Sequence, residues 1–112
     1  GSDTLSFKIV TGATTGISSA TLFPNPTSGP CRLVFELSDQ MQVRWDIYTL
    51  AGQRLYSFSD ELPAGAQVLS WDGRDDQDDA IANGTYLYVL RGVPSGGDGR
   101  ELTRTGKLVI MR

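Results

Sequence analysis

The chain has 112 residues, of which 39% are hydrophobic and 21% charged, a balance that fits one folded domain and not two separate cores. Its net charge of −3 argues against a nucleic-acid partner held through its phosphates. Histidine is absent and there is one cysteine, which excludes histidine-based catalytic pairs, His-ligated zinc and an internal disulfide. No apolar run is long enough to span a bilayer.

The compact domain is predicted to cover residues 18–112, with residues 1–17 outside it. The first two residues are typical of an expression scar, residues 3–10 alternate polar and apolar side chains, and residues 11–18 resemble a Gly/Thr/Ser linker. The alternating octet is either the last strand of a preceding domain or a leading edge strand. We expect the parent protein to be longer at its amino end and to finish at the last residue of this chain.

Seven stretches of alternating polarity predict short strands separated by turn signals. The loop of residues 24–30 carries three prolines and cannot lie inside a sheet. No window keeps apolar residues at helical spacing for three turns. The sequence therefore predicts an all-β, immunoglobulin-like antiparallel β-sandwich of about seven strands. The predicted strands are residues 19–23, 31–37, 41–49, 53–58, 67–71, 84–91 and 101–111.

The same alternation predicts which side chains face the core. Tyr48 and Tyr56 are expected on outer faces, whereas Tyr86 is expected to be a buried tyrosine whose hydroxyl bonds a nearby backbone group. Cys31 is interpreted as a small buried hydrophobe rather than a reactive thiol. The residues expected to point inward are Cys31, Leu33, Phe35, Leu37, Met41, Val43, Trp45, Ile47, Leu69 and Trp71.

An acidic loop at residues 72–79 is a candidate calcium site, because calcium prefers several oxygen ligands. Arg74 takes a ligand position of the EF-hand pattern, however, and the closing glutamate of that pattern is missing. The favoured interpretation is turn chemistry, in which aspartates accept backbone N–H groups and Arg74 pairs with a neighbouring carboxylate. No other cofactor is expected. The candidate calcium ligands are Asp72, Asp75, Asp76, Asp78 and Asp79.

The residue set also argues against an enzyme. The clustered carboxylates share one loop, whereas glycoside hydrolysis needs two acids on opposite sides of a cleft. We therefore expect no catalytic residues in this chain.

Six segments, in order, resemble a known family. They read LFPNPTSG at residues 22–29, VRWDIYTLAGQRL at 43–55, LPAG at 62–65, LSWDGRDD at 69–76, ANGTYLY at 82–88 and GKLVI at 106–110. Each is weak alone, but together they make the chain similar to the FlgD-type immunoglobulin-like domain, which overlaps with the type IX secretion (Por) C-terminal sorting domains of Bacteroidetes-like bacteria. The resemblance covers roughly residues 18–112.

The resemblance implies a C-terminal secretion, sorting and surface-anchoring domain of a secreted or cell-surface protein, exported through the periplasm and outer membrane. The implied partners are the outer-membrane translocon, a surface sortase and a preceding cargo domain in the same chain. The long hairpin of residues 92–100 is similar to versions that the sortase does not cleave. Carried over by position, the sorting signal comprises Pro24, Asn25, Pro26, Gly52, Gly84, Tyr86, Lys107, Leu108, Val109, Ile110, Met111 and Arg112.

A terminal strand at a sheet edge would offer a receptor its backbone groups, together with the side chains of Lys107 and Arg112, by strand addition. The same strand also completes the core through Leu108 and Ile110. One residue departs from the family pattern: Asp78 stands where glycine is usual, and aspartate can take the same left-handed dihedrals.

Two other functions are compatible with the sequence. One is a carbohydrate- or surface-ligand-binding module attached to a secreted hydrolase, and the other is a spacer or adhesion domain. An exposed row of aromatic side chains on one sheet would favour the carbohydrate-binding module. Burial of Trp45 and Trp71 would count against it.

Overall fold

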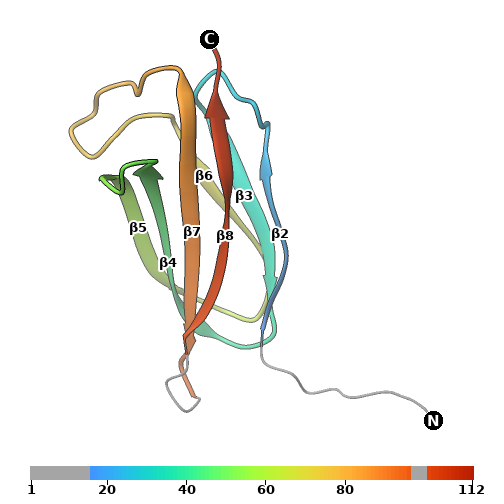
Figure 1. The fold of residues 1–112 in the computed structure, drawn as a ribbon. Coiled ribbons are helices and arrows are strands. Elements are labelled where there is room, and N and C mark those ends of the chain that lie inside the picture. Colours follow the sequence, from blue (N-terminus) through green and yellow to red (C-terminus); the bar gives the residue numbers. More distant parts are fainter. Residues whose placement is uncertain (1–15, 97–100) are drawn as a thin grey trace.

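The computed structural model describes residues 16–96 and 101–112, which form two packed layers of strands (Figure 1). The opening octet, most of the predicted linker and the centre of the last hairpin lie outside the described residues. Every strand pair is antiparallel. The strands are β2 (Ile17–Phe23), β3 (Cys31–Leu37), β4 (Met41–Thr49), β5 (Arg54–Leu62), β6 (Gly65–Trp71), β7 (Gly84–Pro94) and β8 (Leu102–Ile110).

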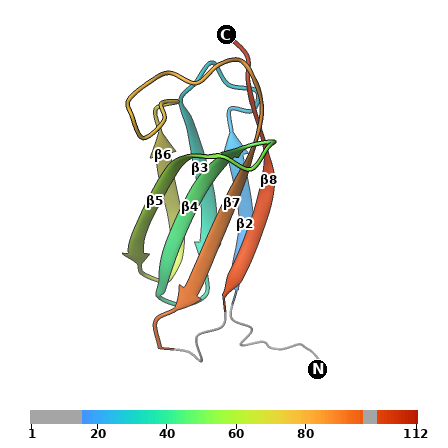
Figure 2. The same cartoon turned by 60° about the vertical axis from the view of Figure 1, so that its left-hand side comes forward.

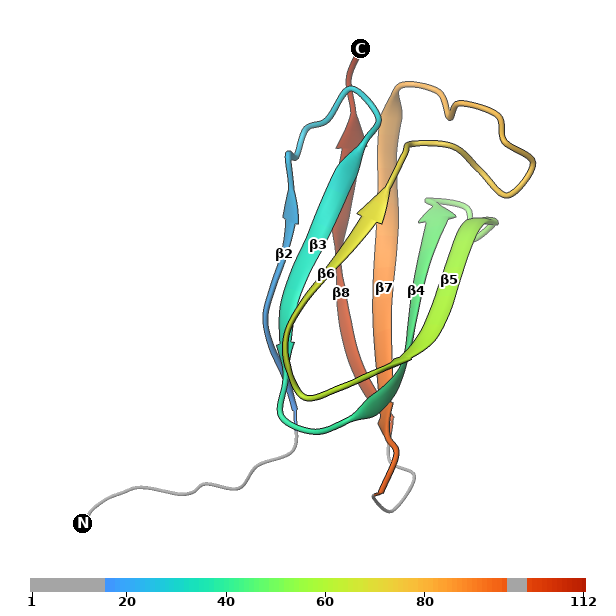
Figure 3. The same cartoon turned by 180° about the vertical axis from the view of Figure 1, so that it is seen from behind.

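The two layers are a three-stranded sheet in the order β2-β3-β6 and a four-stranded sheet in the order β5-β4-β7-β8. Figure 2 shows the four-stranded sheet in front, and Figure 3, which views the molecule of Figure 1 from behind, shows the three-stranded sheet in front. Strand β8 therefore lies at the edge of the larger sheet. The predicted all-β sandwich with seven antiparallel strands is confirmed for the part of the chain that the structure describes.

The ends of some strands differ from the prediction, because hydrogen-bonded pairing with a neighbouring strand, and not the alternation of polar and apolar side chains, determines where these strands end. Strands β3 and β4 have the predicted bounds, but β5 continues to Leu62 because its polar end pairs with the start of β4. Strand β7 likewise continues to Pro94, opposite Met41. Backbone hydrogen bonds to a neighbouring strand hold these extensions, and alternation of polarity carries no signal for them.

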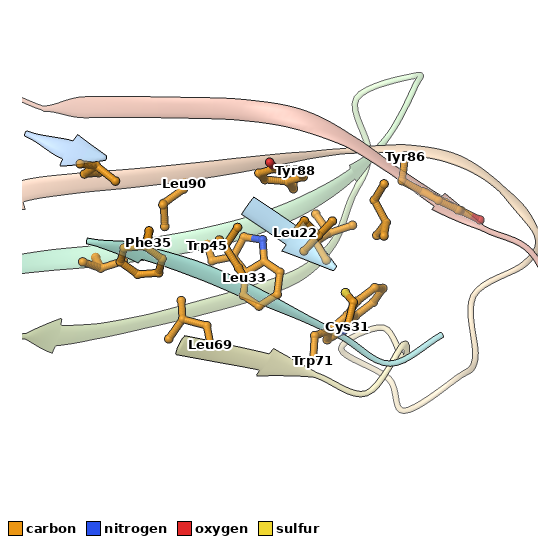
Figure 4. Packing of buried hydrophobic residues seen from close by; sticks show 14 of the residues in the cluster. Leu22, Cys31, Leu33, Phe35, Trp45, Leu69, Trp71, Tyr86, Tyr88 and Leu90 are labelled. Carbon is orange, nitrogen blue, oxygen red and sulfur yellow. The ribbon is translucent and has the colours of Figure 1, made fainter. Parts of the chain in front are cut away.

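The core fills the space between the sheets with the side chains that alternation predicts. Trp45 is fully buried at its centre, and Trp71, Cys31 and Phe35 are buried around it (Figure 4). The prediction for Tyr56 is wrong. It pairs with Ile47 and so shares the inward face of the larger sheet.

Two aromatic contacts hold Tyr56 in that position. Its ring lies edge-on to Trp45, with centroids 6.0 Å apart, and 5.6 Å from the ring of Trp71. Both distances are within the usual range for interacting aromatic pairs.

Tyr86 and Tyr88 are buried neighbours on one face of β7 with different hydrogen bonding. The Tyr86 hydroxyl donates to the carbonyl of Ala82 at 2.6 Å, as predicted. The Tyr88 hydroxyl has no hydrogen-bond partner among the described residues, and its ring covers Gly106 so closely that a Cβ there would lie 2.5 Å from the hydroxyl oxygen. Tyr86 therefore anchors the chain that leads into β7, and Tyr88 packs against β8.

The pair provides a matched test of this anchor. We expect Tyr86→Phe to lower the free energy of unfolding by about 1 kcal/mol, because the Ala82 carbonyl loses its partner. Tyr88→Phe removes the same atom without breaking a hydrogen bond and should have a much smaller effect. Urea denaturation measures both, and equal losses would contradict the assignment.

Candidate recognition site at the carboxyl-terminal strand

The outer edge of β8 is paired by a loop of the other sheet. The side chain of Asn25 lies beside the strand, where its amide nitrogen donates to the carbonyl of Lys107 at 2.8 Å. Its amide oxygen accepts from the backbone N–H of Val109 at 3.0 Å. One side chain thus satisfies a donor and an acceptor, as a neighbouring strand would.

Thr27 continues this pairing with its backbone. Its N–H donates to the carbonyl of Val109 at 2.9 Å, and its carbonyl accepts from the N–H of Met111 at 2.8 Å. The contact is a parallel bridge between Thr27 and Ile110. Thr27 is buried, and its hydroxyl donates to the carbonyl of Pro30, which fixes the loop.

The last residue is held on the opposite side. The backbone N–H of Arg112 donates to the side-chain oxygen of Asn83 at 3.1 Å, and its guanidinium donates to the carbonyl of Ile81. The guanidinium also lies over Gly29, where a Cβ would be 3.2 Å from a guanidinium nitrogen. Arg112 therefore ties the chain end to two separate loops.

We call this set of contacts, made by residues 25–30, 81–83 and 107–112, the carboxyl-terminal clasp. Its loops pack tightly, since a Cβ on Gly73 would lie 2.7 Å from the backbone of Gly29, and Gly73 has a φ of +85°. Glycine is needed at this position for both reasons. The acidic loop therefore packs against the clasp at Gly73, and within the clasp the loop of residues 24–30 is bonded to the chain end.

The clasp corrects the expectation that the whole edge of β8 is open to strand addition. The outward backbone groups of β8 belong to alternate residues, and those from the Lys107 carbonyl to the Met111 N–H are already bonded. Within the described residues, Thr103, Thr105 and the N–H of Lys107 present outward backbone groups without a partner strand on that side. A partner strand can pair with the carboxyl half of the edge only by displacing the loop.

The predicted sorting residues gather at this end of the sandwich. Gly84 pairs with Ile110 and Tyr86 with Leu108, while Pro24 and Pro26 flank the clasp residue Asn25. Gly52 lies in the β4–β5 turn at the same end, next to the Thr49–Tyr86 pair, but it makes none of the clasp contacts; its φ of +94° requires a residue that tolerates the left-handed region. The structure therefore brings together eleven of the twelve predicted residues, the exception being Gly52.

Within this group, the cationic side chains of Lys107 and Arg112, both predicted to be offered to a receptor, differ in how free they are. Lys107 is exposed on the outer face of β8, and Met111 is 63% exposed beside the chain end. Leu108 and Ile110 face the core. The guanidinium of Arg112 is engaged in the clasp, so the freely presented side chains are those of Lys107 and Met111.

The acidic loop is held by turn chemistry. Asp75 accepts the backbone N–H groups of Gln77 and Asp79 at 2.9 and 3.0 Å, and Arg74 donates to the carbonyl of Asp78 at 2.9 Å. Asp78 has a φ of +67°, the left-handed conformation expected for a residue in a glycine position. Across the described residues no three acidic, cysteine or histidine side chains are grouped for a metal ion, and so the candidate ligands Asp72, Asp75, Asp76, Asp78 and Asp79 are not brought together.

Burial also determines the reactivity of the cysteine. Burial raises the pKa of the Cys31 thiol to about 11, which agrees with an inert core residue.

Trp45 and Trp71 are 0% and 3% exposed, so neither presents a face to a sugar ring. Phe23 is the one largely exposed aromatic ring among the described residues, and Arg32 lies over it. The condition that would favour the carbohydrate-binding module is therefore not met by these residues.

One polar cluster was not predicted from the sequence. Asp46 alternates with the inward residues Trp45 and Ile47, which assigns it to the outer face of β4, yet it is fully buried there. It accepts from the Arg91 guanidinium at 2.8 Å, from Arg44 at 3.1 Å and from the Tyr48 hydroxyl at 3.2 Å. Burial alone would raise the pKa of Asp46, but hydrogen bonds from Ser57, Arg44 and Tyr48 outweigh it and hold the pKa below its ordinary value. Alternation gives no sign of such burial.

No family model matches the sequence, and no curated protein matches it. Among solved structures, the chain is similar to dimeric latent PorU from Porphyromonas gingivalis, with a TM-score of 0.73 and 18% identity over 93% of this chain and 10% of that one. It is also similar to FlgD from Xanthomonas campestris, described in connection with the hook capping essential for flagellar assembly. That match has a TM-score of 0.57 and 19% identity over 85% of this chain and 65% of that one.

The FlgD-type fold is confirmed. The sequence motifs pointed to FlgD-type and Por domains, and solved structures of FlgD and PorU are among those that share this fold. At these identities the likeness concerns the fold. The chain spans a small part of PorU and 65% of FlgD. No stretch that the structure describes forms a helix suited to crossing a membrane.

The clasp can be tested through a single side chain. We expect Asn25→Ala to speed hydrogen exchange at the Val109 amide by about tenfold, because that N–H loses its acceptor. The amide of Trp45, inside the sheet, serves as an internal control and should be unaffected. An unchanged Val109 rate would mean that the loop does not protect the edge.

The buried carboxylate predicts a specific pH dependence. Because the pKa of Asp46 is lowered by folding, its ionised form stabilises the protein above the unfolded value of about 3.9, and this stabilisation is lost as the pH falls through the folded value. We expect Asp46→Asn to reduce the free energy of unfolding at neutral pH by about 2 kcal/mol. The loss of stability on acidification should also become shallower.

Urea denaturation across a pH series measures both effects. Asp79→Asn is the control, since Asp79 is exposed and its side chain makes no hydrogen bond within the described residues. If Asp46→Asn and the wild type had the same pH slope, the assignment would be wrong.

Proposed function

We propose that this chain is a non-catalytic sorting domain at the carboxyl end of a secreted bacterial protein, recognised in its folded form at the carboxyl-terminal clasp. The observation that carries the proposal is the convergence of the segments that the sequence resemblance gave as the signal. The proline loop, the start of β7 and the end of β8 are far apart in sequence and hydrogen-bonded or paired in space. The fold likeness to PorU and FlgD supports a related domain.

Recognition of a folded surface follows from the hydrogen bonds at the edge of β8. The Asn25 side chain and the Thr27 backbone occupy the outward groups between Lys107 and Met111, so a receptor meets side chains at this end. Lys107 supplies one exposed positive charge, and Met111, four residues further along the chain, supplies an adaptable apolar contact. A small surface of this kind suits an acidic and partly apolar patch on the receptor.

The proposed partners are the outer-membrane translocon and, after export, a surface sortase. A cargo domain would precede the sandwich in the same chain, and the location would be the cell surface or the medium, reached through the periplasm and outer membrane. The domain itself would carry out no reaction. The activity of the parent protein would belong to the cargo.

An export assay tests the proposal. The chain is fused behind a Sec leader and a fluorescent cargo in a bacterium that has type IX secretion. We expect the wild-type fusion to reach the surface or the medium, and Lys107→Gln together with Met111→Ser to leave it in the periplasm, because both exposed contacts are lost. Fluorescence in each fraction is the measurement.

The control is Arg104→Gln, which removes one positive charge from an exposed position of the same strand. Circular dichroism and thermal melting of each purified variant establish that it is folded. Arg112 is left intact, because its loss would open the clasp. Periplasmic retention of the wild type, or normal export of the folded double variant, would contradict the proposal.

A further inference from the structure

The cluster around Asp46 leaves two guanidinium groups fixed at the surface of the four-stranded sheet. Arg44 lies directly opposite Arg91 across the β4–β7 pair. Like charges in this arrangement repel each other. The buried carboxylate of Asp46 resolves the repulsion, because it accepts a hydrogen bond from each arginine. Two arginines and one aspartate leave one positive charge in excess.

Several donors of the two arginines remain unused. Each guanidinium carries several N–H groups, and within the described residues Arg44 bonds Asp46, while Arg91 bonds Asp46 and the Tyr48 hydroxyl. The side chain of Arg44 is 46% exposed and that of Arg91 is 32% exposed. The remaining N–H groups are therefore available to a ligand, in an orientation that Asp46 holds fixed.

These donors border a shallow hollow of about 390 Å³. Tyr48 and Gln42 add further polar groups to its wall, and Val93 contributes an apolar part. Planar guanidinium groups bind carboxylate and phosphate oxygens in pairs, with good geometric fit. An oxyanion is thus the ligand chemistry that the hollow suits best.

Glu101 is the one opposing charge in the wall. It is exposed at the rim, and its charge makes the smallest contribution to the raised pKa of Arg91, to which the hydrogen bond with Tyr48 contributes most. No ion pair joins Glu101 to either arginine among the contacts of the described residues. Its carboxylate weakens the attraction of the hollow for an anion without occupying the guanidinium donors.

We propose that this hollow binds a single oxyanion group, either a phosphate or a sugar carboxylate, through Arg44 and Arg91. Arg44 and Arg91 contact the ligand oxygens, and Asp46 acts as the positioning residue that prevents the two guanidiniums from separating. The Tyr48 hydroxyl donates to the same oxygen of Asp46, Oδ2, that accepts from Arg91. The site lies on the outer face of β4 and β7, so it is independent of the proposed sorting role of the clasp.

Titration of the full chain, followed by amide chemical shifts, tests the site. The probes are inorganic phosphate and glucuronate, each against sodium chloride at equal ionic strength. We expect saturable shifts confined to β4 and β7 around Arg44 and Arg91. Saturation by phosphate alone, by glucuronate alone or by both supports the site and identifies its ligand class. Absence of saturable shifts with both probes would overturn it.

Three variants make the test specific. Arg44→Met should weaken binding by about fivefold or more, and Glu101→Gln should tighten it by about threefold, as expected for single charges at an exposed site. Arg32→Met, on the other sheet, makes the same charge change as Arg44→Met and should leave the affinity unchanged. Because Glu101→Gln is expected to gain affinity, a folding defect cannot produce the predicted result. Equal affinity in Arg44→Met and the wild type would overturn the proposal.

Discussion

A strand at the edge of a sheet exposes one row of backbone N–H and C=O groups that its own sheet cannot bond. In this molecule, the way in which these groups are bonded at the carboxyl end of β8 determines how the two sheets and the chain end are joined. Asn25 and Thr27, from a loop of the opposite sheet, bond the outer edge of β8 between Lys107 and Met111. These bonds tie the two sheets together at one end. They also determine which parts of the chain end remain available to a partner.

The clasp gives the chain end both a structural and a recognition role, and the two roles fall on different side chains. Leu108, Ile110 and Arg112 hold the fold, since the first two are buried and the third is hydrogen-bonded to the loop that precedes β7. Lys107 and Met111 face outward. Removing the whole strand would therefore destroy the sandwich, whereas exchanging the outward side chains leaves the clasp bonds in place. Any functional study of this terminus depends on that distinction.

Alternation of polarity was sufficient to predict the fold, because a buried face every second residue is a local property of each strand. It placed Trp45, Trp71 and Leu108 in the core correctly. It failed for Tyr56, which packs between the two tryptophans, and for Asp46, which is buried on a face expected to meet solvent. Both outcomes depend on neighbours supplied by other strands, which no local pattern encodes.

The sequence predicted which residues belong to the candidate site, but not how they are arranged in space. The motif resemblance selected Asn25, Tyr86 and Lys107, yet nothing in the sequence shows that a side-chain amide pairs with β8. Thr27 and Asn83 stand within quoted motifs and were not singled out, because their role requires the chain end to lie beside them. The Arg44–Arg91 pair depends in the same way on the β4–β7 register.

The central claim is that the loop and the chain end are hydrogen-bonded to each other in the folded protein. Nuclear magnetic resonance experiments that detect couplings across hydrogen bonds measure this directly. The structure predicts couplings from the Met111 nitrogen to the Thr27 carbonyl carbon and from the Thr27 nitrogen to the Val109 carbonyl carbon. If the couplings between β7 and β8 were observed and these two were absent, the clasp would not exist as described.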